Sequence, residues 1–223
     1  MNRHHANFLR RWWLLSYGRH EMVQELSKIQ RYVVCGQVTK RPVFAFISSD
    51  IRPNAALIVF PLADDYSFGI LQSNVHWSWF KARCSTLKGD FRYTSNTVFD
   101  SFPWPQSPTA ANVRAIAQSA RELRNTRRHV MSRNDWSFRD LYRSLELPGE
   151  NPVNTAHDRL DAAVMSAYGF SPSDDILERI LELNHTVADK EALGEAVIGP
   201  GLPPTVTNAD DFFSDDAIGI STP

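Results

Sequence analysis

The first half of the chain alternates short apolar runs with polar turns. An apolar and basic lead-in at residues 8–15 and a short predicted helix at 21–29 come first. Runs rich in β-branched and aromatic side chains follow, and such runs between polar turns predict strands. The predicted strands are residues 32–38, 43–47, 57–61 and 92–98.

Between residues 67 and 81 the apolar side chains recur at helical spacing instead. This period predicts an amphipathic helix that packs one face on a core. The recurring residues are Phe68, Leu71, Val75, Trp79 and Phe80.

The second half of the chain carries the helical period throughout. Ser107 can cap a long helix with Pro108 at its first position, and apolar residues then repeat at helical spacing to about His129. Gly169 suits a left-handed C-cap and Ser173 suits an N-cap. The shorter predicted helices are residues 137–145, 154 or 155 to 168, 174–184 and 191–197.

These patterns predict an α+β fold in three parts. We expect a small mixed β-sheet with helices in residues 1–105, an all-helical part in 106–198 and a disordered acidic tail in 199–223, where Gly, Pro and Asp dominate. A chain of 223 residues with 43% apolar content can bury a substantial core. No apolar run reaches the length of a membrane span, and the basic N-terminus does not suit a signal peptide. A cytoplasmic protein is expected.

Net charge is divided unevenly along the chain. Residues 1–144 carry 21 Lys and Arg against 10 Asp and Glu, a balance of +11. Residues 145–223 carry 3 against 15, a balance of −12. This asymmetry indicates that the first part faces a polyanion. Alternatively, the acidic end solubilises the chain or folds back on the basic part.

A string of cations interleaved with aromatic and small polar residues follows the predicted helix at 67–81. Such a string suits a nucleic-acid surface, because cations contact phosphates while amides and hydroxyls reach base edges. Asn96 and Ser95 are the candidate base contacts here. The candidate backbone contacts are Lys40, Arg41, Lys81, Arg83, Lys88, Arg92 and Tyr93. The simpler interpretation is a surface helix with a solvated basic flank.

Three further groups of polar residues are candidates for a site. The segment 129–135 is predicted to be a loop in which Arg133 suits guanine and Asn134 suits adenine, although loops also carry such residues merely because they are solvated. Asp158 and Asp161 have the spacing of an acid–base pair, but helix-surface charges explain them better. Five arginines of the long helix form either a solvated face or one that follows a nucleic-acid backbone. They are Arg114, Arg121, Arg124, Arg127 and Arg128.

The cysteines do not predict a metal site. Cys35 and Cys84 are isolated in the sequence, and His76 is the only histidine that could support them. Two reduced thiols in a cytoplasmic protein are expected instead.

Three ordered motifs resemble the target-recognition region of MmeI-like DNA methyltransferases of restriction–modification systems. The central motif is FGILQS…HWSW…GDFRYTSNTVFDSFPWP. It is preceded by RRWWLLSYGRHEM and followed by HDRLDAAVMSAYGFSPSDDILERILELN. Together they cover most of the chain.

The resemblance implies sequence-specific recognition of double-stranded DNA. Enzymes of this family transfer a methyl group from S-adenosylmethionine to the exocyclic amine of adenine, often beside a nuclease domain. The transfer needs a glycine-rich cofactor loop and an Asn/Asp-Pro-Pro-aromatic tetrapeptide, and this chain contains neither. We therefore expect the chain to bind no cofactor and to lack catalytic residues, with the methyltransferase half, its partner, upstream of residue 1.

Two other functions stay open at this point. A stand-alone interaction module would use the acidic helical end to dock on a basic partner. A small enzyme with an unrecognised site is the third possibility, and it lacks any grouping of nucleophile, base and orienting residue.

Overall fold

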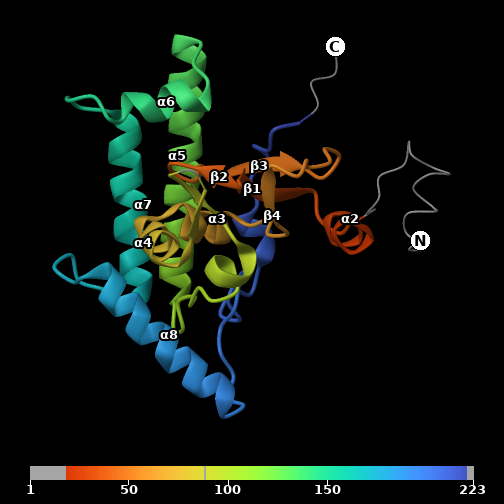
Figure 1. The fold of residues 1–223 in the computed structure, drawn as a ribbon, viewed down its shortest axis with the longest axis vertical. Helices are drawn as coiled ribbons and strands as arrows, with labels where there is room; N and C mark the ends of the chain where they lie inside the picture. The colour runs from red at the N-terminus through yellow and green to blue at the C-terminus, as the bar shows by residue number, and fades with distance from the viewer. Residues whose placement is uncertain (1–18, 88, 220–223) are drawn as a thin grey trace.

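The computed structural model describes residues 19–87 and 89–219, and the lead-in at 8–15 lies outside them (Figure 1). Two small antiparallel sheets and a set of helices confirm the predicted α+β class. Helix α2 (His20–Leu26) occupies most of the predicted helix at 21–29. Leu26, Met22 and Ile29 pack on one face of the first sheet.

The first sheet, sheet A, has the strand order β3-β1-β4. Its strands are β1 (Arg31–Gly36), β3 (Ala45–Ser48) and β4 (Leu57–Phe60). Val33 of the central strand β1 pairs with Phe46 on one side and Phe60 on the other. The first five residues of β1 are buried, so both faces of sheet A are covered.

The second sheet, sheet B, has the order β2-β6-β5. Its strands are β2 (Val38–Thr39), β5 (Ser85–Leu87) and β6 (Asp90–Arg92). The predicted single mixed sheet is therefore wrong, because the run at 32–38 divides at Gln37. The N–H of Gln37 donates to Ala56 in the connection before β4, and its carbonyl accepts from Tyr93 after β6. The backbone of this one residue thus links the two sheets.

The helix predicted at 67–81 is two helices, α3 (Asp65–Gln72) and α4 (Asn74–Arg83). Ser73 between them has extended backbone, and its hydroxyl accepts the N–H of His76 as an N-cap. All eight residues of α3 are buried, so this helix is not amphipathic. The apolar residues that were predicted to be core are buried.

A strand was predicted at 92–98, but β6 ends at Arg92. The π-helical turn η1 (Ser95–Phe99) follows it. The N–H of Val98 donates to the carbonyl of Thr94, and the hydroxyls of Thr94 and Thr97 also bond to each other. These local bonds close a turn over residues whose β-branched side chains suggested a strand.

The segment 108–198 is helical, as predicted. Its helices are α5 (Ala110–Asn134), α6 (Phe138–Ser144), α7 (Pro152–Tyr168) and α8 (Ile176–Ala192). Figure 1 shows α5 and α7 side by side, and α3 packs against α5. At Gly69 of α3 a Cβ would come within 2.5 Å of Ile116, so glycine permits this close approach of α3 to α5.

Several predicted helix ends differ from those observed. Thr109 caps α5 instead of Ser107, because its side chain and that of Asn112 form a reciprocal capping box. Asn151 caps α7 and Asp175 caps α8, so both helices begin at positions other than those predicted. The separate helix predicted at 191–197 is wrong, because α8 continues to Ala192 and residues 193–198 are not helical. Gly169 ends α7 in the left-handed conformation, as predicted.

The C-terminal segment predicted to be a disordered tail is folded as far as residue 219. It contains a short 3₁₀ turn, η2 (Ala209–Phe212), and Phe212 is buried in the core. Ile218 then pairs with Ile47 at the outer edge of β3, as a parallel bridge. The C-terminal segment is ordered by contacts with residues far away in the sequence, and amino-acid composition does not reveal such contacts.

Candidate nucleic-acid interface

Sheet B presents alternate side chains to opposite sides. Phe91 faces α4, where its ring lies 5.5 Å from that of Trp77 and 5.9 Å from that of Phe80. Because side chains alternate along a strand, Asp90 and Arg92 face away from α4. Arg92 pairs with Val38 of β2 and Ser85 of β5, and its side chain is exposed.

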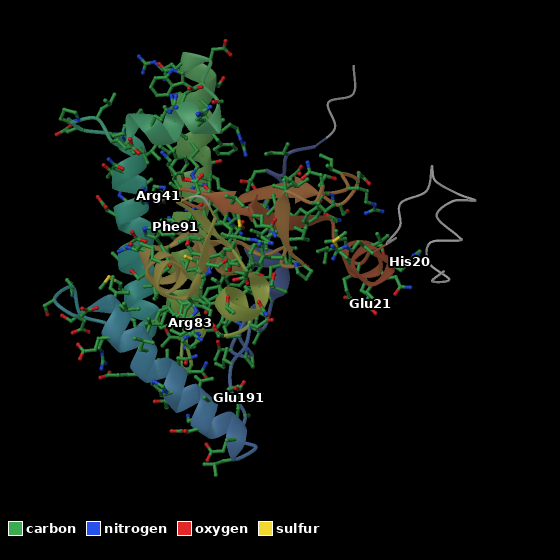
Figure 2. All side chains as sticks on the ribbon, in the orientation of Figure 1. His20, Glu21, Arg41, Arg83, Phe91 and Glu191 are labelled. Carbon is green, nitrogen blue, oxygen red and sulfur yellow. The ribbon has the colours of Figure 1, made fainter. Side chains whose placement is uncertain are left out.

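Five of the predicted backbone contacts are exposed around sheet B and the end of α4. Lys81 and Arg83 occupy the last turn of α4, just before β5, and each lies 5.4 Å from a tryptophan ring of the same helix. Figure 2 labels Arg83, Phe91 and Arg41 in one region, away from α2. We call the five residues the cationic patch: Lys40, Arg41, Lys81, Arg83 and Arg92.

The cationic patch is exposed and is not held in ion pairs by the described chain. Within residues 19–87 and 89–219, none of its five members forms a salt bridge. Arg41 instead lies 5.7 Å from the ring of Tyr142. Lys88, the remaining predicted cation of this group, lies outside the described residues. The arrangement leaves the five charges available to a polyanion.

Tyr93 was predicted to contact a DNA backbone, and this is wrong. Its side chain is fully buried, stacks on Phe80 with ring centroids 5.2 Å apart, and bonds through its hydroxyl to His76 Nε2 at 3.0 Å. Burial raises the pKa of the phenol. Ser95 and Asn96, two and three residues further on, are exposed on η1.

Arg133 and Asn134 belong to a helix and not to the predicted loop. α5 continues through both of them, and Asp135 ends it in the left-handed conformation with φ of 53°. Both side chains are exposed, and the Asn134 amide donates to the Val130 carbonyl. The 25-residue helix α5 is about 37 Å long, and Figure 1 places its C-terminal end beside α6. The structure therefore separates them from Ser95 and Asn96.

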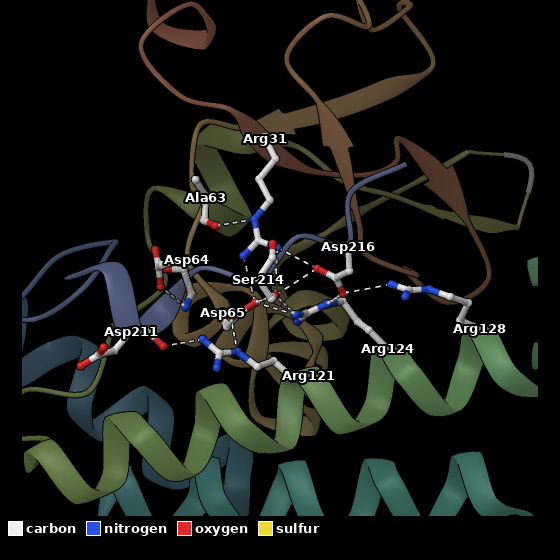
Figure 3. Close-up of polar contacts among 11 residues, drawn as sticks. Arg31, Ala63, Asp64, Asp65, Arg121, Arg124, Arg128, Asp211, Ser214 and Asp216 are labelled. Atoms are coloured by element: carbon white, nitrogen blue, oxygen red, sulfur yellow. Dashed lines mark hydrogen bonds and ion pairs between the residues drawn. The ribbon is translucent and has the colours of Figure 1, made fainter. Parts of the chain in front are cut away.

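A buried charge cluster lies between α3, α5, sheet A and the C-terminal segment (Figure 3). Asp65, whose side chain is fully buried, accepts from Arg31 at 2.9 Å and from Arg121 and Arg124 at 2.5 Å each. Asp216 accepts from Arg31 at 2.7 Å and from Arg124 at 2.6 Å.

This cluster was not recognised in the sequence. The two adjacent acids Asp64 and Asp65, at the start of a fully buried apolar helix, were the available signal. Asp64 caps α3 by accepting the N–H of Ser67, which leaves Asp65 to balance the arginines.

Three arginines of α5 fit neither predicted role. Arg124 and Arg127 are buried, and Arg121 is bonded to Asp65, so they are neither solvated nor available to a nucleic-acid backbone. Arg127 donates to the Phe44 carbonyl and lies 5.3 Å from the ring of Tyr142; burial lowers its pKa. Arg114 is exposed, which is compatible with both predicted roles.

Asp158 and Asp161 lie in different environments. Asp158 is exposed, whereas Asp161 accepts the N–H of Asn74 at the start of α4 at 2.7 Å. Burial raises the pKa of Asp161 to about 6, although the bond from Asn74 opposes the shift. Asp161 therefore joins α7 to α4, and the pair carries no acid–base arrangement.

Replacement of Asp161 with Asn is expected to stabilise the protein at pH 7 and to leave it unchanged at pH 4. The raised pKa means that folding favours the protonated form. Ionisation of this side chain therefore lowers the free energy of unfolding by roughly 2 kcal/mol as pH rises from about 4 to 6. Asn keeps an acceptor for Asn74 and carries no charge. Urea unfolding at both pH values measures the difference, and Asp158→Asn is the matched exposed control. Equal stability of Asp161→Asn and the unmodified chain at pH 7 would contradict this.

Cys35, Cys84 and His76, the candidates for a metal site, lie in different environments. Cys35 is buried, which raises its pKa, and Cys84 is half-buried. His76 is fully buried and bonded to Tyr93. Among the residues that the structure describes, no cluster of three His, Cys, Asp or Glu could hold an ion. In the same part of the chain, no helix combines the length and apolarity needed to cross a membrane.

Comparisons with known proteins find similar sequences and a similar fold. Residues 24–106 match the family model described as "MmeI, target recognition domain". DNA methyltransferase A of Bacillus subtilis (strain 168) is 29% identical over 131 residues, which are 57% of this chain and 14% of that protein. A solved structure of the type IIL restriction-modification enzyme MmeI in complex with DNA is similar to 72% of this chain, with a TM-score of 0.61 and 24% identity.

These matches confirm the resemblance to the target recognition region of MmeI-like enzymes. The matched segment 24–106 includes sheet A, sheet B, the cationic patch and η1. The chain spans 22% of the length of the solved MmeI chain and 14% of the length of the curated relative, so it corresponds to a part of each.

Proposed function

We propose that this chain is the sequence-reading part of an S-adenosylmethionine-dependent, adenine-specific DNA methyltransferase of a restriction–modification system. It binds double-stranded DNA through the cationic patch, the outward face of sheet B and η1. The observation that carries the proposal is the set of five exposed cations without salt bridges, gathered within the segment that matches a target recognition domain.

The parts of this surface differ in what they contact. The five cations contact phosphates, which position the domain but carry no sequence information. Asn96 and Ser95 on η1 reach base edges, for which amides and hydroxyls are suited. Asp90, beside Arg92 on the outward face of sheet B, adds an acceptor suited to the amino group of cytosine. Arg133 and Asn134 form a second candidate contact at the far end of α5.

The rigidity of this surface supports the same function. Strands of two or three residues do not persist alone, and sheet B is held by the packing of Phe91 on Trp77 and Phe80 of α4. Reading a base edge requires donors and acceptors to be fixed within fractions of an ångström, and α4, which is itself packed in the core, supplies that support.

The catalytic steps belong to the upstream half. S-adenosylmethionine and the flipped adenine are held there, because the cofactor loop and the base-binding tetrapeptide are missing from this sequence. The chain alone then binds no cofactor and transfers no methyl group. Its partners are duplex DNA, the upstream methyltransferase domain and, in fused enzymes, a nuclease domain.

Substitutions within the full enzyme separate the two kinds of contact. Arg83→Ala is expected to reduce the slope of log affinity against log salt by about 0.9 and to weaken all sequences alike. Asn96→Ala is expected to cost about 1–3 kcal/mol on the preferred site and little elsewhere, which relaxes specificity at one base pair. Binding is measured by fluorescence anisotropy, and the methylated sequence by sequencing of the product.

Matched controls make the result specific. Arg114→Ala removes another exposed arginine, on α5 and outside the cationic patch, and is expected to leave the salt slope unchanged. Arg133→Ala and Asn134→Ala test the second candidate contact. If Arg83→Ala and Arg114→Ala behave alike, the cationic patch does not face DNA; if Asn96→Ala leaves the methylated sequence unchanged, η1 does not read bases.

A further inference from the structure

The C-terminal segment lies across a row of arginines on α5. Arg121, Arg124 and Arg128 occupy successive turns of the helix, within about 10 Å along its axis. In Figure 3 the residues around Ser214 run over this row, with Arg31 of β1 reaching the same place from the other side. We call residues 209–219 the strap.

Each arginine of the row is bonded to the strap. Arg121 donates to the backbone carbonyl of Asp211, and Arg124 donates to Ser214 Oγ at 2.9 Å and to Asp216 at 2.6 Å. Arg128, whose side chain is 58% exposed, reaches Asp216 at 3.5 Å. The Ser214 hydroxyl donates in turn to Asp65 at 2.8 Å, so the strap is tied to the buried acid as well.

The strap is anchored at both ends. Phe212, before Ser214, is buried in the main core. After Asp216, the N–H of Ile218 donates to Phe46 and its carbonyl accepts from Ser48, so the strap adds to the outer edge of β3. The contacts of Asp216 with arginines are therefore fixed in geometry and do not depend on a freely moving acidic end.

The electrostatic role of the strap follows from a comparison of charges. Four arginines converge here, and Asp65 balances only one of them. Asp216 supplies a second carboxylate, whose burial would raise its pKa; the hydrogen bond and charge of Arg124, with the charge of Arg31, outweigh burial and lower it. Without the strap, Asp65 alone would face Arg31 and the three arginines of the row, which leaves four positive charges against one negative charge. Such an excess of positive charge along α5 attracts nucleic-acid phosphates.

We propose that the strap acts as an internal polyanion that closes the arginine row of α5 to nucleic acid. This inference rests on the proposed function, because the strap would confine DNA to the surface around sheet B, where base edges are read. Sequence-independent attraction at a second face would compete with that reading, since phosphate contacts add affinity for every sequence alike.

The test uses the full chain, a chain ending at Asn208 and the variant Asp216→Asn. Each is titrated with a duplex of arbitrary sequence over a salt series, by fluorescence anisotropy, and with heparin, a polyanion without base edges. Ending the chain at Asn208 is expected to steepen the salt slope by about 2–3, since each newly paired cation contributes about 0.9. Asp216→Asn is expected to steepen it by about 0.9, because Arg128 is already half-exposed.

Asp211→Asn is the matched control. It removes the same charge from the strap, but the strap contacts of residue 211 run through its backbone carbonyl, so its slope is expected to match that of the unmodified chain. Circular dichroism shows which variants are folded. If the shortened chain unfolds, Asp216→Asn decides the question, because asparagine preserves the shape of the side chain.

The outcomes separate this proposal from the proposed function. Unchanged slopes for duplex and heparin in a folded Asp216→Asn variant would overturn the role of the strap, whatever Arg83→Ala does. If the unmodified chain and its Arg83→Ala variant bind duplex identically while Asp216→Asn binds heparin more steeply, the strap proposal stands and the DNA surface around sheet B is wrong.

Discussion

Replacement of Asp65 with Ala is expected to remove about 3–5 kcal/mol from the free energy of unfolding, the largest single-residue effect foreseen here. Asp65 is fully buried and accepts from Arg31, Arg121 and Arg124. Without its carboxylate, two guanidinium groups that are less than a tenth exposed would share Asp216 alone. An uncompensated buried charge is among the costliest defects that one substitution can create.

Urea unfolding measures this loss. The control is Glu25→Ala, which also breaks an ion pair, with Lys28 at 2.7 Å, but one whose side chains are more than half exposed. Exposed pairs contribute about 0–1 kcal/mol, so the control is expected to change little. A loss below about 1 kcal/mol for Asp65→Ala would mean that water enters the cluster and solvates the arginines.

Acidification from pH 7 to pH 4 is expected to remove about 4 kcal/mol of stability through two buried histidines, net of the opposing effect of Asp161. His76 and His157 are buried, and burial lowers the pKa of each from 6.5 to about 3; for His157 the charges of Arg127 and Arg41 act in the same direction. Their stabilising contribution is complete above pH 6.5 and is lost as pH falls, because only the unfolded chain takes up the protons. Each histidine accounts for about 3 kcal/mol at pH 4.

Asp161 partly offsets this loss. Its pKa is raised to about 6, so acidification below that value gains about 2 kcal/mol. Urea midpoints from pH 7 to pH 4 measure the net effect, and NMR of the imidazole carbons tests its cause. The signals of His76 and His157 are expected to stay in the neutral form down to pH 4. A midtransition near pH 6.5 for either ring would show that it is hydrated, and His129→Gln, an exposed position, serves as the control for the pH profile.

Local patterns predicted the strands and the long helices because their causes are local. The β-branched and aromatic runs at 32–38, 43–47 and 57–61 pair as strands, and the apolar period after Thr109 forms α5. The break at Ser73 was not predicted, since the apolar spacing continues through it. The break lies at Ser73, whose extended backbone ends α3 and whose hydroxyl caps α4.

The contacts that the sequence did not reveal join residues far apart along the chain. Asp216 meets Arg31 across 185 positions and Arg124 across 92. Arginines on a helix normally extend into solvent, so Arg124 and Arg127 gave no sign of burial. The cationic patch was predictable in composition because its members cluster in sequence, whereas Tyr93, in the same string, turns inward as the aromatic that stacks on Phe80.

Alternation along β6 gives its neighbouring residues different evolutionary constraints. Phe91 faces inward and fixes the strand on α4, so a change there would be felt by the core. Asp90 and Arg92 face outward, and Arg92 has no salt bridge within the described chain. Mutations at the outward positions are therefore nearly free of folding cost. Under the proposed function, a lineage of such proteins alters its base contacts by single steps at Asp90, and selection on stability would not resist the change.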